Sequence, residues 1–152
     1  DPSAANGSSI ALLAEFDGHA MLLTGDAHAE VLAASIRALL VARGRGETRL
    51  PLSAFKLSHH GSAHATTSEL LGVIDCQNYL VSTNSSIFQH PDVAALARVV
   101  LEGGQAQRRP VLHFNHRSER TGFWGSETLR RRYDFNAVFP EVGQSGLVLR
   151  LP

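Results

Sequence analysis

The sequence predicts an α/β fold with a mixed β-sheet, because strand-like and helix-like segments alternate along its 152 residues. Residues 9–15 and 19–24 are apolar and strand-like, and Asp17-Gly18 between them favours a tight hairpin turn. Residues 29–42 carry apolar side chains at helical spacing and are followed by Gly44, a helix stop. An antiparallel hairpin followed by strand–helix alternation indicates both antiparallel and parallel strand pairing.

The remaining elements continue this alternation. Strands are predicted over residues 52–58, 79–83, 110–115, 134–138 and 146–151, and helices over residues 67–74 and 91–102. The polar segments 84–89 and 117–125 are expected to be loops. At this length the chain has room for one core, so we expect residues 1–152 to form a single unit.

Composition excludes some classes of protein. Fourteen basic residues balance fourteen acidic ones, which gives no support for general attraction to nucleic acids or membranes. No apolar run approaches the roughly 20 residues of a membrane helix, and no signal-peptide pattern is present, so a cytoplasmic protein without a membrane segment is expected. Seven arginines form a local basic surface, more typical of a solvated face than of a polyanion site: Arg108, Arg109, Arg117, Arg120, Arg130, Arg131 and Arg132.

Two clusters at predicted strand ends carry residues suited to chemistry. In Thr24-Gly25-Asp26 the carboxylate either faces a cleft or caps the helix that follows. In His59-His60-Gly61-Ser62 two imidazoles offer neutral lone pairs to a metal. If the strand continues through this pair, the alternation of side chains selects His59 as the residue that faces the site.

A third cluster, Gln89-His90-Pro91-Asp92, opens a predicted helix. His90 is open to three interpretations: a neighbour of metal ligands, an acid that contacts substrate, or a loop residue. His64 lies close in sequence to the His59 cluster and is a candidate for substrate binding. The further histidines that could take part are His28, His113 and His116.

The order of these pieces resembles one known family. The sequence contains, in order, an apolar strand and hairpin, the motif LLTGD, a helix, the motif FKLSHHGS, a strand with Ser82 and a His-Pro helix start. This order resembles the C-terminal half of metallo-β-lactamase-superfamily hydrolases. The branch most similar is that of competence-type DNA-uptake proteins and related phosphodiesterases. The resemblance covers residues 6–100 and, more faintly, the segment GLVLRL near the end, and its specificity lies in LLTGD and HHGS occurring together.

This resemblance implies roles for individual residues. Asp26 matches the carboxylate that bridges two metal ions, His59 matches a late histidine ligand, and His60 matches the histidine beside it, so that either His59 or His60 binds metal. Ser62 matches a residue that orients the loop or contacts substrate. His60, His64 and His90 are candidates to protonate the leaving group, and Arg117 and Arg120 to contact substrate.

The family's HxHxDH signature is missing from this sequence. Asp26 and one histidine cannot hold two Zn²⁺ ions, since each needs roughly four ligands. The resemblance therefore implies a chain that is active only with an N-terminal half, packed against it as an αββα sandwich.

The implied activity is that of a binuclear hydrolase with two Zn²⁺ ions, or Mn²⁺, which cleaves phosphodiesters and most plausibly DNA. The chain has no initiator Met, and we therefore expect proteolytic activation by a cut ahead of Asp1. Two alternatives stay open. The domain is either a degenerate binding or regulatory module, or a hydrolase of a β-lactam, thioester or lactone.

Overall fold

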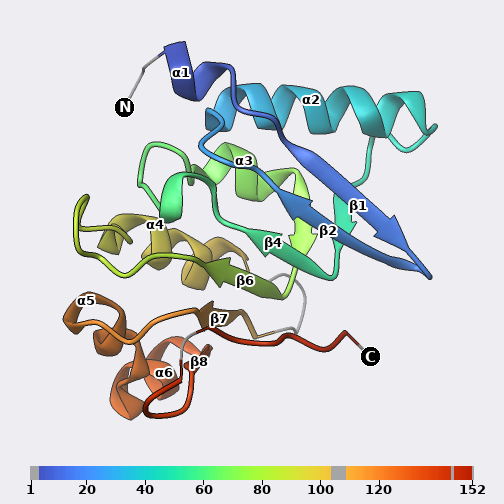
Figure 1. Cartoon of the computed structure of the whole chain (residues 1–152). Coiled ribbons are helices and arrows are strands. Elements are labelled where there is room, and N and C mark those ends of the chain that lie inside the picture. The colour runs from blue at the N-terminus through green and yellow to red at the C-terminus, as the bar shows by residue number, and fades with distance from the viewer. Residues whose placement is uncertain (1–3, 104–108, 145, 152) are drawn as a thin grey trace.

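A computed structural model describes residues 4–103, 109–144 and 146–151 of the chain (Figure 1). Within this part the chain forms a six-stranded mixed sheet in the order β1-β2-β4-β6-β7-β8 and a two-stranded sheet of β3 and β5. The strands are β1 (Leu12–Phe16), β2 (His19–Leu23), β3 (Leu50–Leu52), β4 (Ala54–Lys56), β5 (Ile74–Cys76), β6 (Asn78–Val81), β7 (Val111–Phe114) and β8 (Asn136–Val138). β1 pairs antiparallel with β2, and the other pairs are parallel, so the predicted α/β class with a mixed sheet is confirmed.

Helices connect the strands. They are α1 (Ala4–Gly7), α2 (Ala29–Ala42), α3 (Ser68–Gly72), α4 (Val93–Arg98), α5 (Glu119–Gly122) and α6 (Glu127–Tyr133), with short helical turns η1 (Ser58–His60), η2 (Val99–Gly103) and η3 (Phe123–Gly125). No helix in the described ranges is long and apolar enough to cross a membrane. The predicted helix over residues 29–42 is confirmed with the same bounds.

The hairpin forms as the sequence predicted. Asp17 and Gly18 both have positive φ, 47° and 79°, which is the backbone that a two-residue turn between twisted antiparallel strands requires. The register pairs Leu12 with Leu23 and Phe16 with His19.

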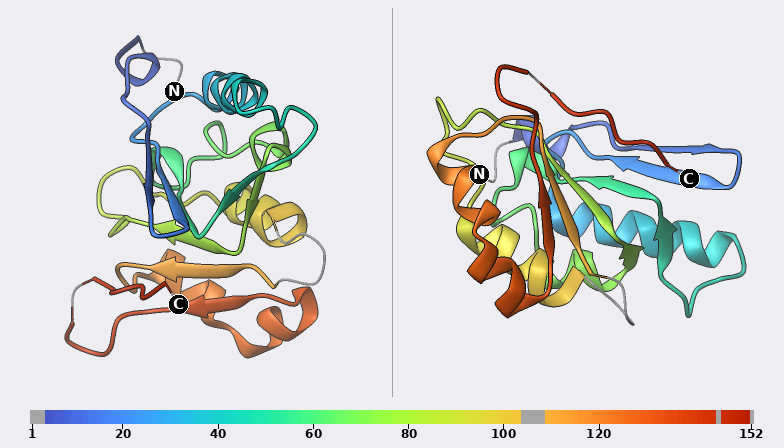
Figure 2. Two further views of the ribbon diagram at one scale, coloured as in Figure 1. Left: turned by 90° about the vertical axis from the view of Figure 1, so that its right-hand side faces the viewer. Right: turned by 90° about the horizontal axis from the view of Figure 1, so that it is seen from below.

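One face of the six-stranded sheet forms the core. Leu22, Phe55, Tyr79 and Leu112 are neighbours in one row across four parallel strands, and all four are buried. The rings of Phe55 and Tyr79 meet edge to face, with centroids 6.2 Å apart. Helices α2, α3 and α4 lie on this side of the sheet (Figure 2), so its apolar side chains are removed from water.

The opposite face is only partly covered. The next row consists of Leu23, Lys56, Leu80, His113 and Val138, and each of these residues retains solvent exposure. Figure 2 shows the C-terminal segment passing over this side, away from the helices. The sheet therefore has one face packed by helices and one that a single extended segment covers incompletely.

The structure of the C-terminal segment differs from the strand that the sequence predicts. Residues 146–151 belong to no strand, although Leu149 and Leu151 lie beside Ala14 and Met21 of the hairpin. Their apolar pattern predicted a strand, but Leu147 and Val148 are exposed, Leu149 and Leu151 are only partly buried, and the segment forms no ladder.

Further elements differ from the prediction in bounds or in kind. The expected strand over 52–58 is divided into the end of β3 and β4, because Ser53 turns to donate its N–H to Ala20 O. The expected loop 117–125 contains α5 and η3. The expected helix 91–102 is α4 followed by the π-helical turn η2.

Candidate functional site

Two of the predicted clusters meet at one edge of the sheet. β2 and β4 are adjacent and parallel, with Leu23 opposite Lys56, so the segments that follow them emerge side by side. His59 N donates to Gly25 O at 3.0 Å, and Ser58 Oγ donates to Ala27 O at 2.7 Å. The turn that carries Asp26 is therefore bonded directly to the turn that carries His59 and His60.

The histidine turn has an unusual backbone. His59, His60 and Gly61 are left-handed in succession, with φ of 46°, 57° and 86°. Bonds from Gly61 N to Ser58 O and from Ser62 N to His59 O close the turn. The condition under which alternation along a strand would select His59 is not met, because the strand ends at Lys56 and the backbone coils before the histidines.

The two histidines have different surroundings. His60 Nδ1 lies 2.6 Å from Ser82 O at the end of β6, and because a carbonyl only accepts, Nδ1 carries the proton. This leaves Nε2 as a lone-pair donor, the arrangement usual for a metal-binding histidine. The ring of His59 instead faces that of His90, with centroids 5.2 Å apart.

His90 and Asp92 bring the third cluster to the same place. Asp92 Oδ2 accepts from Ala63 N at 2.7 Å, and Asp92 N donates to Gly61 O at 2.9 Å. His90 Nδ1 lies 3.4 Å from Asp92 Oδ1. Asp26, His59, His60 and His90, predicted as site residues from three separate clusters, thus belong to turns at one edge of the sheet.

The electrostatics suit a ligand histidine. Burial lowers the pKa of His59, while the charge of Asp26 acts in the opposite direction. A lowered pKa favours the neutral imidazole at neutral pH, the form that binds a metal. Burial likewise lowers the pKa of Lys56, again opposed by Asp26, so the Asp26 carboxylate acts on both groups.

The alternative role for Asp26, as the cap of α2, is not what the structure shows. The N-cap of α2 is His28, and no side chain caps this helix. The backbone N–H of Asp26 donates to Ser9 Oγ at 3.3 Å, outside the helix. The Asp26 carboxylate therefore has no capping function in this structure.

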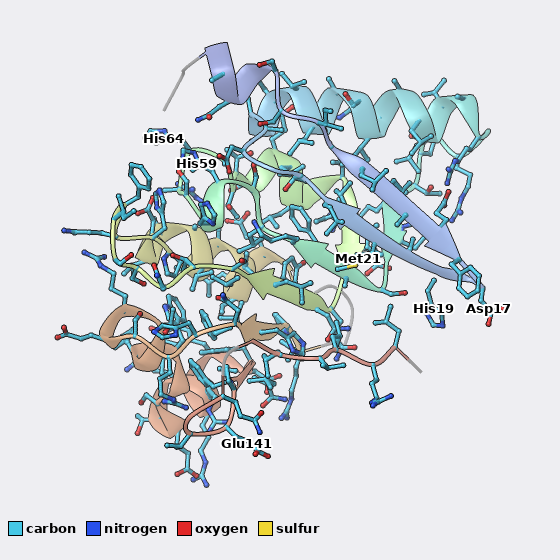
Figure 3. All side chains as sticks on the ribbon, in the orientation of Figure 1. Asp17, His19, Met21, His59, His64 and Glu141 are labelled. Atoms are coloured by element: carbon cyan, nitrogen blue, oxygen red, sulfur yellow. The ribbon has the colours of Figure 1, made fainter. Side chains whose placement is uncertain are left out.

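The other predicted site residues have different surroundings. His64 is exposed on the loop that follows the histidine turn (Figure 3), whereas Ser62 is only 3% exposed and belongs to the interior of the turn. Arg117 stacks on Phe139, with Cζ 3.9 Å from the ring centroid, and Arg120 donates to Gln89 Oε1 at 2.6 Å.

The remaining histidines are placed elsewhere. His28 begins α2, His113 lies on β7 with Nε2 3.0 Å from Asn78 Oδ1, and His116 is exposed after β7.

Sequence reasoning did not single out Asp92 or Asn115. Asn115, which follows β7, accepts from Thr83 N at 2.8 Å and so ties the ends of β6 and β7 together. Asp92 stands two residues after His90, which is a signal that it could take part in the site. The sequence pattern was interpreted only as the start of a helix.

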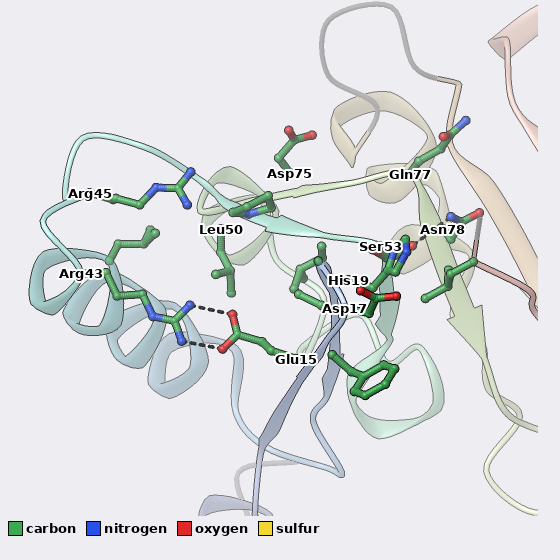
Figure 4. A pocket seen from close by; sticks show the side chains of 17 residues that line it. Glu15, Asp17, His19, Arg43, Arg45, Leu50, Ser53, Asp75, Gln77 and Asn78 are labelled. Carbon is green, nitrogen blue, oxygen red and sulfur yellow. Dashed lines mark hydrogen bonds and ion pairs between the residues drawn. The ribbon is translucent and has the colours of Figure 1, made fainter.

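A hollow lies at the opposite end of the strands from the histidine turns, beside the hairpin tip (Figure 4). It is a cavity of about 650 Å³, and its lining includes Arg43, which forms a bidentate ion pair with Glu15 at 2.7–2.8 Å. It also contains His19, whose Nδ1 lies 3.1 Å from Ser53 Oγ. In open α/β sheets ligands bind at the carboxyl ends of parallel strands, so we place the candidate site at the histidine turns rather than here.

Asp26, His59, His60 and His90 are residues of the types that bind metal ions. Within the described residues, no group of three or more His, Cys, Asp or Glu side chains is arranged to hold an ion.

The sequence matches no protein-family model, and neither the curated proteins nor the solved structures give a match.

Gly61→Ala is expected to destabilise the protein by about 1–3 kcal/mol. An alanine there would need φ of +86°, and its Cβ would lie 3.0 Å from Pro91 Cβ. Gly18→Ala is the matched control, because its φ is +79° and nothing lies within 4 Å. Urea unfolding of both variants measures the difference, and equal losses would show that the contact with Pro91 contributes nothing.

Proposed function

We propose that this chain is the C-terminal half of a metallo-β-lactamase-type domain and contributes to a metal-dependent hydrolase of phosphodiesters, DNA being the expected substrate. The observation that carries the proposal is the direct bonding of the Asp26 turn to the His59–His60 turn at the carboxyl ends of β2 and β4. A carboxylate and two histidines brought together from segments about 30 residues apart in sequence make a metal site more plausible than either motif does alone.

The residues that would hold metal are Asp26, His59 and His60. Carboxylate oxygen and imidazole nitrogen are the donors that Zn²⁺ accepts, and Mn²⁺ also takes the carboxylate. Bound ions would lower the pKa of water to about 7 and neutralise charge on the phosphate. Because these residues are too few for two ions, further ligands are proposed to come from an N-terminal half that carries the HxHxDH motif.

The partly covered sheet face offers a place for that half. Its central row contains Leu23, Leu80 and Val138, which are apolar and retain exposure. A second sheet packed on this face would bury them and complete a sandwich of two sheets.

His90, next to His59, is the proposed proton donor to the leaving oxygen.

The experiment is to produce this chain alone and together with a half that bears HxHxDH. Alone, it is expected to self-associate and to cleave nothing, because its sheet face is open and its ligand set incomplete. Together, the two are expected to form a soluble complex that holds Zn²⁺ by elemental analysis and cleaves single-stranded DNA and bis(p-nitrophenyl) phosphate.

The alternatives give different results. A stable complex that holds no metal and cleaves nothing would favour a binding module. Turnover of a β-lactam, thioester or lactone without cleavage of either phosphodiester would retain the fold and replace the substrate. A monodisperse chain produced alone would contradict the partnership.

A further inference from the structure

Asp92 stands at the N-cap of α4 but does not cap it. Its φ and ψ are those of a capping residue, −73° and 137°, yet its side chain makes no bond to the first turn of the helix. Aspartate is common at this position because its carboxylate usually accepts from that turn. Here the carboxylate is directed elsewhere, and its two oxygens have separate neighbours.

One oxygen holds the histidine turn. Asp92 Oδ2 accepts from Ala63 N at 2.7 Å, just beyond the turn, and Asp92 N donates to Gly61 O at 2.9 Å. Arg98, on the same helix, supports this connection by donating to Ala63 O at 2.7 Å and Thr66 O at 2.9 Å. The start of α4 and the segment after the histidine turn are thus fixed to each other.

The other oxygen lies beside His90. Asp92 Oδ1 is 3.4 Å from His90 Nδ1, a nitrogen that is buried and has no hydrogen-bond partner. The side chain of His90 is 14% exposed, so water has little access to satisfy that nitrogen. The carboxylate is an acceptor only, and a small approach of the two groups would make it the partner of Nδ1–H.

We propose that Asp92 is a positioning residue: it holds the His59–His60 turn with one carboxylate oxygen and fixes the orientation of His90 with the other. The inference rests on the proposed function, in which His90 donates a proton to the leaving oxygen. With Nδ1–H directed to Asp92, Nε2 is the ring nitrogen that remains for the substrate. An acidic residue that orients a catalytic histidine in this way is a recurrent device in hydrolases.

Hydroxide attacks phosphorus and forms a new P–O bond, and the P–O bond to the leaving oxygen breaks with its electron pair going to that oxygen. His90 acts in its protonated form, with Nδ1–H directed to Asp92 and a second proton on Nε2. The Nε2 proton passes to the same oxygen, which leaves the Nδ1–H tautomer, and water returns a proton to Nε2. The contribution of this proton depends on the leaving group, because an alkoxide must be protonated whereas p-nitrophenolate is a stable anion.

The test is Asp92→Asn in the assembled protein, compared on two substrates. The asparagine oxygen can still accept from Ala63 N, but the amide NH₂ then faces His90 Nδ1. This nitrogen must then accept, so the ring can no longer carry protons on both nitrogens and act as the acid. We expect kcat on single-stranded DNA to fall about 10²-fold with KM little changed, and turnover of bis(p-nitrophenyl) phosphate to fall less than about 3-fold. His90→Gln should give the same pattern, and the double variant should be no worse than His90→Gln.

Asp134→Asn is the control, since this exposed carboxylate forms an ion pair with Arg109 beside α6 and should leave both activities unchanged. A second readout needs neither metal nor turnover. In the metal-free protein labelled with ¹⁵N-histidine, the His90 ring should be the Nδ1–H tautomer in the unmodified chain and the Nε2–H tautomer in Asp92→Asn.

The outcomes separate the two proposals. If the unmodified assembly cleaves neither phosphodiester, the proposed function fails, and the tautomer of His90 still decides the inference about Asp92. If the assembly is active but Asp92→Asn slows both substrates equally, or if His90 is the Nε2–H tautomer in the unmodified chain, Asp92 only stabilises the loop and the inference is overturned.

Discussion

Asp26→Ala is expected to reduce metal-dependent hydrolysis by the assembled protein on the order of 10³-fold or more. The carboxylate follows β2, is free of any capping role at α2, and acts electrostatically on both His59 and Lys56. In the proposed centre it would be shared by two ions, so its loss should lower the metal content as well as the rate. Steady-state assays with elemental analysis of the same samples measure both.

Asp75→Ala is the matched control for this variant. Asp75 lies on β5, in the two-stranded sheet, and lines the hollow at the far end of the strands. It should retain full metal content and rate. Unchanged hydrolysis by Asp26→Ala would contradict the proposed site, whereas equal losses in both variants would indicate damage to the fold.

Phe55→Ala is expected to lower the free energy of unfolding by about 3–5 kcal/mol. Phe55 is fully buried in the central row of the core face, between Leu22 and Tyr79, and alanine would leave a cavity there. Because natural domains are stable by only about 5–15 kcal/mol, this loss is a large fraction of the total. Urea unfolding followed by the fluorescence of Trp124, the one tryptophan and a buried one, measures it.

Phe16→Ala serves as the comparison. Phe16 ends β1 at the hairpin tip and is 85% exposed. Its replacement should change the free energy of unfolding by no more than about 0.5 kcal/mol. Similar losses at the two positions would contradict the assignment of the core face.

The elements predicted well from sequence are those in which two local signals agree. Residues 29–42 combine helical periodicity with a glycine stop, and Asp17-Gly18 has the backbone preference that the hairpin needs. The helices α5 and α6 were missed because their signals are short caps without an apolar stripe. Ser118 and Thr121 form a capping box at α5, and Ser126 accepts from Leu129 N at α6, which contains no buried residue.

The candidate site could be predicted as a set of residues but not as a geometry. Asp26 and the two histidines each follow a strand in the sequence, and the turns that carry them lie at one edge of the sheet. The direction of each ring could not be derived, because the left-handed backbone of His59 and His60 is rare in non-glycine residues and depends on contacts with Gly25 and Asp92 from distant segments. The second role of Asp92 was hidden for the same reason, since a capping residue and a positioning residue look alike in sequence.

The bond from His59 N to Gly25 O also has a consequence for how the protein assembles. Along the chain, α2, β3 and β4 lie between Gly25 and His59, so the two residues come together only when β2 and β4 pair in parallel. Such non-local pairing forms late, after the entropy of closing the intervening loop has been overcome. A nascent or partly unfolded chain would therefore present Asp26 and His59 as separate, weak ligands. Metal capture at this centre should then coincide with completion of the sheet, and metal should slow global unfolding rather than only local opening.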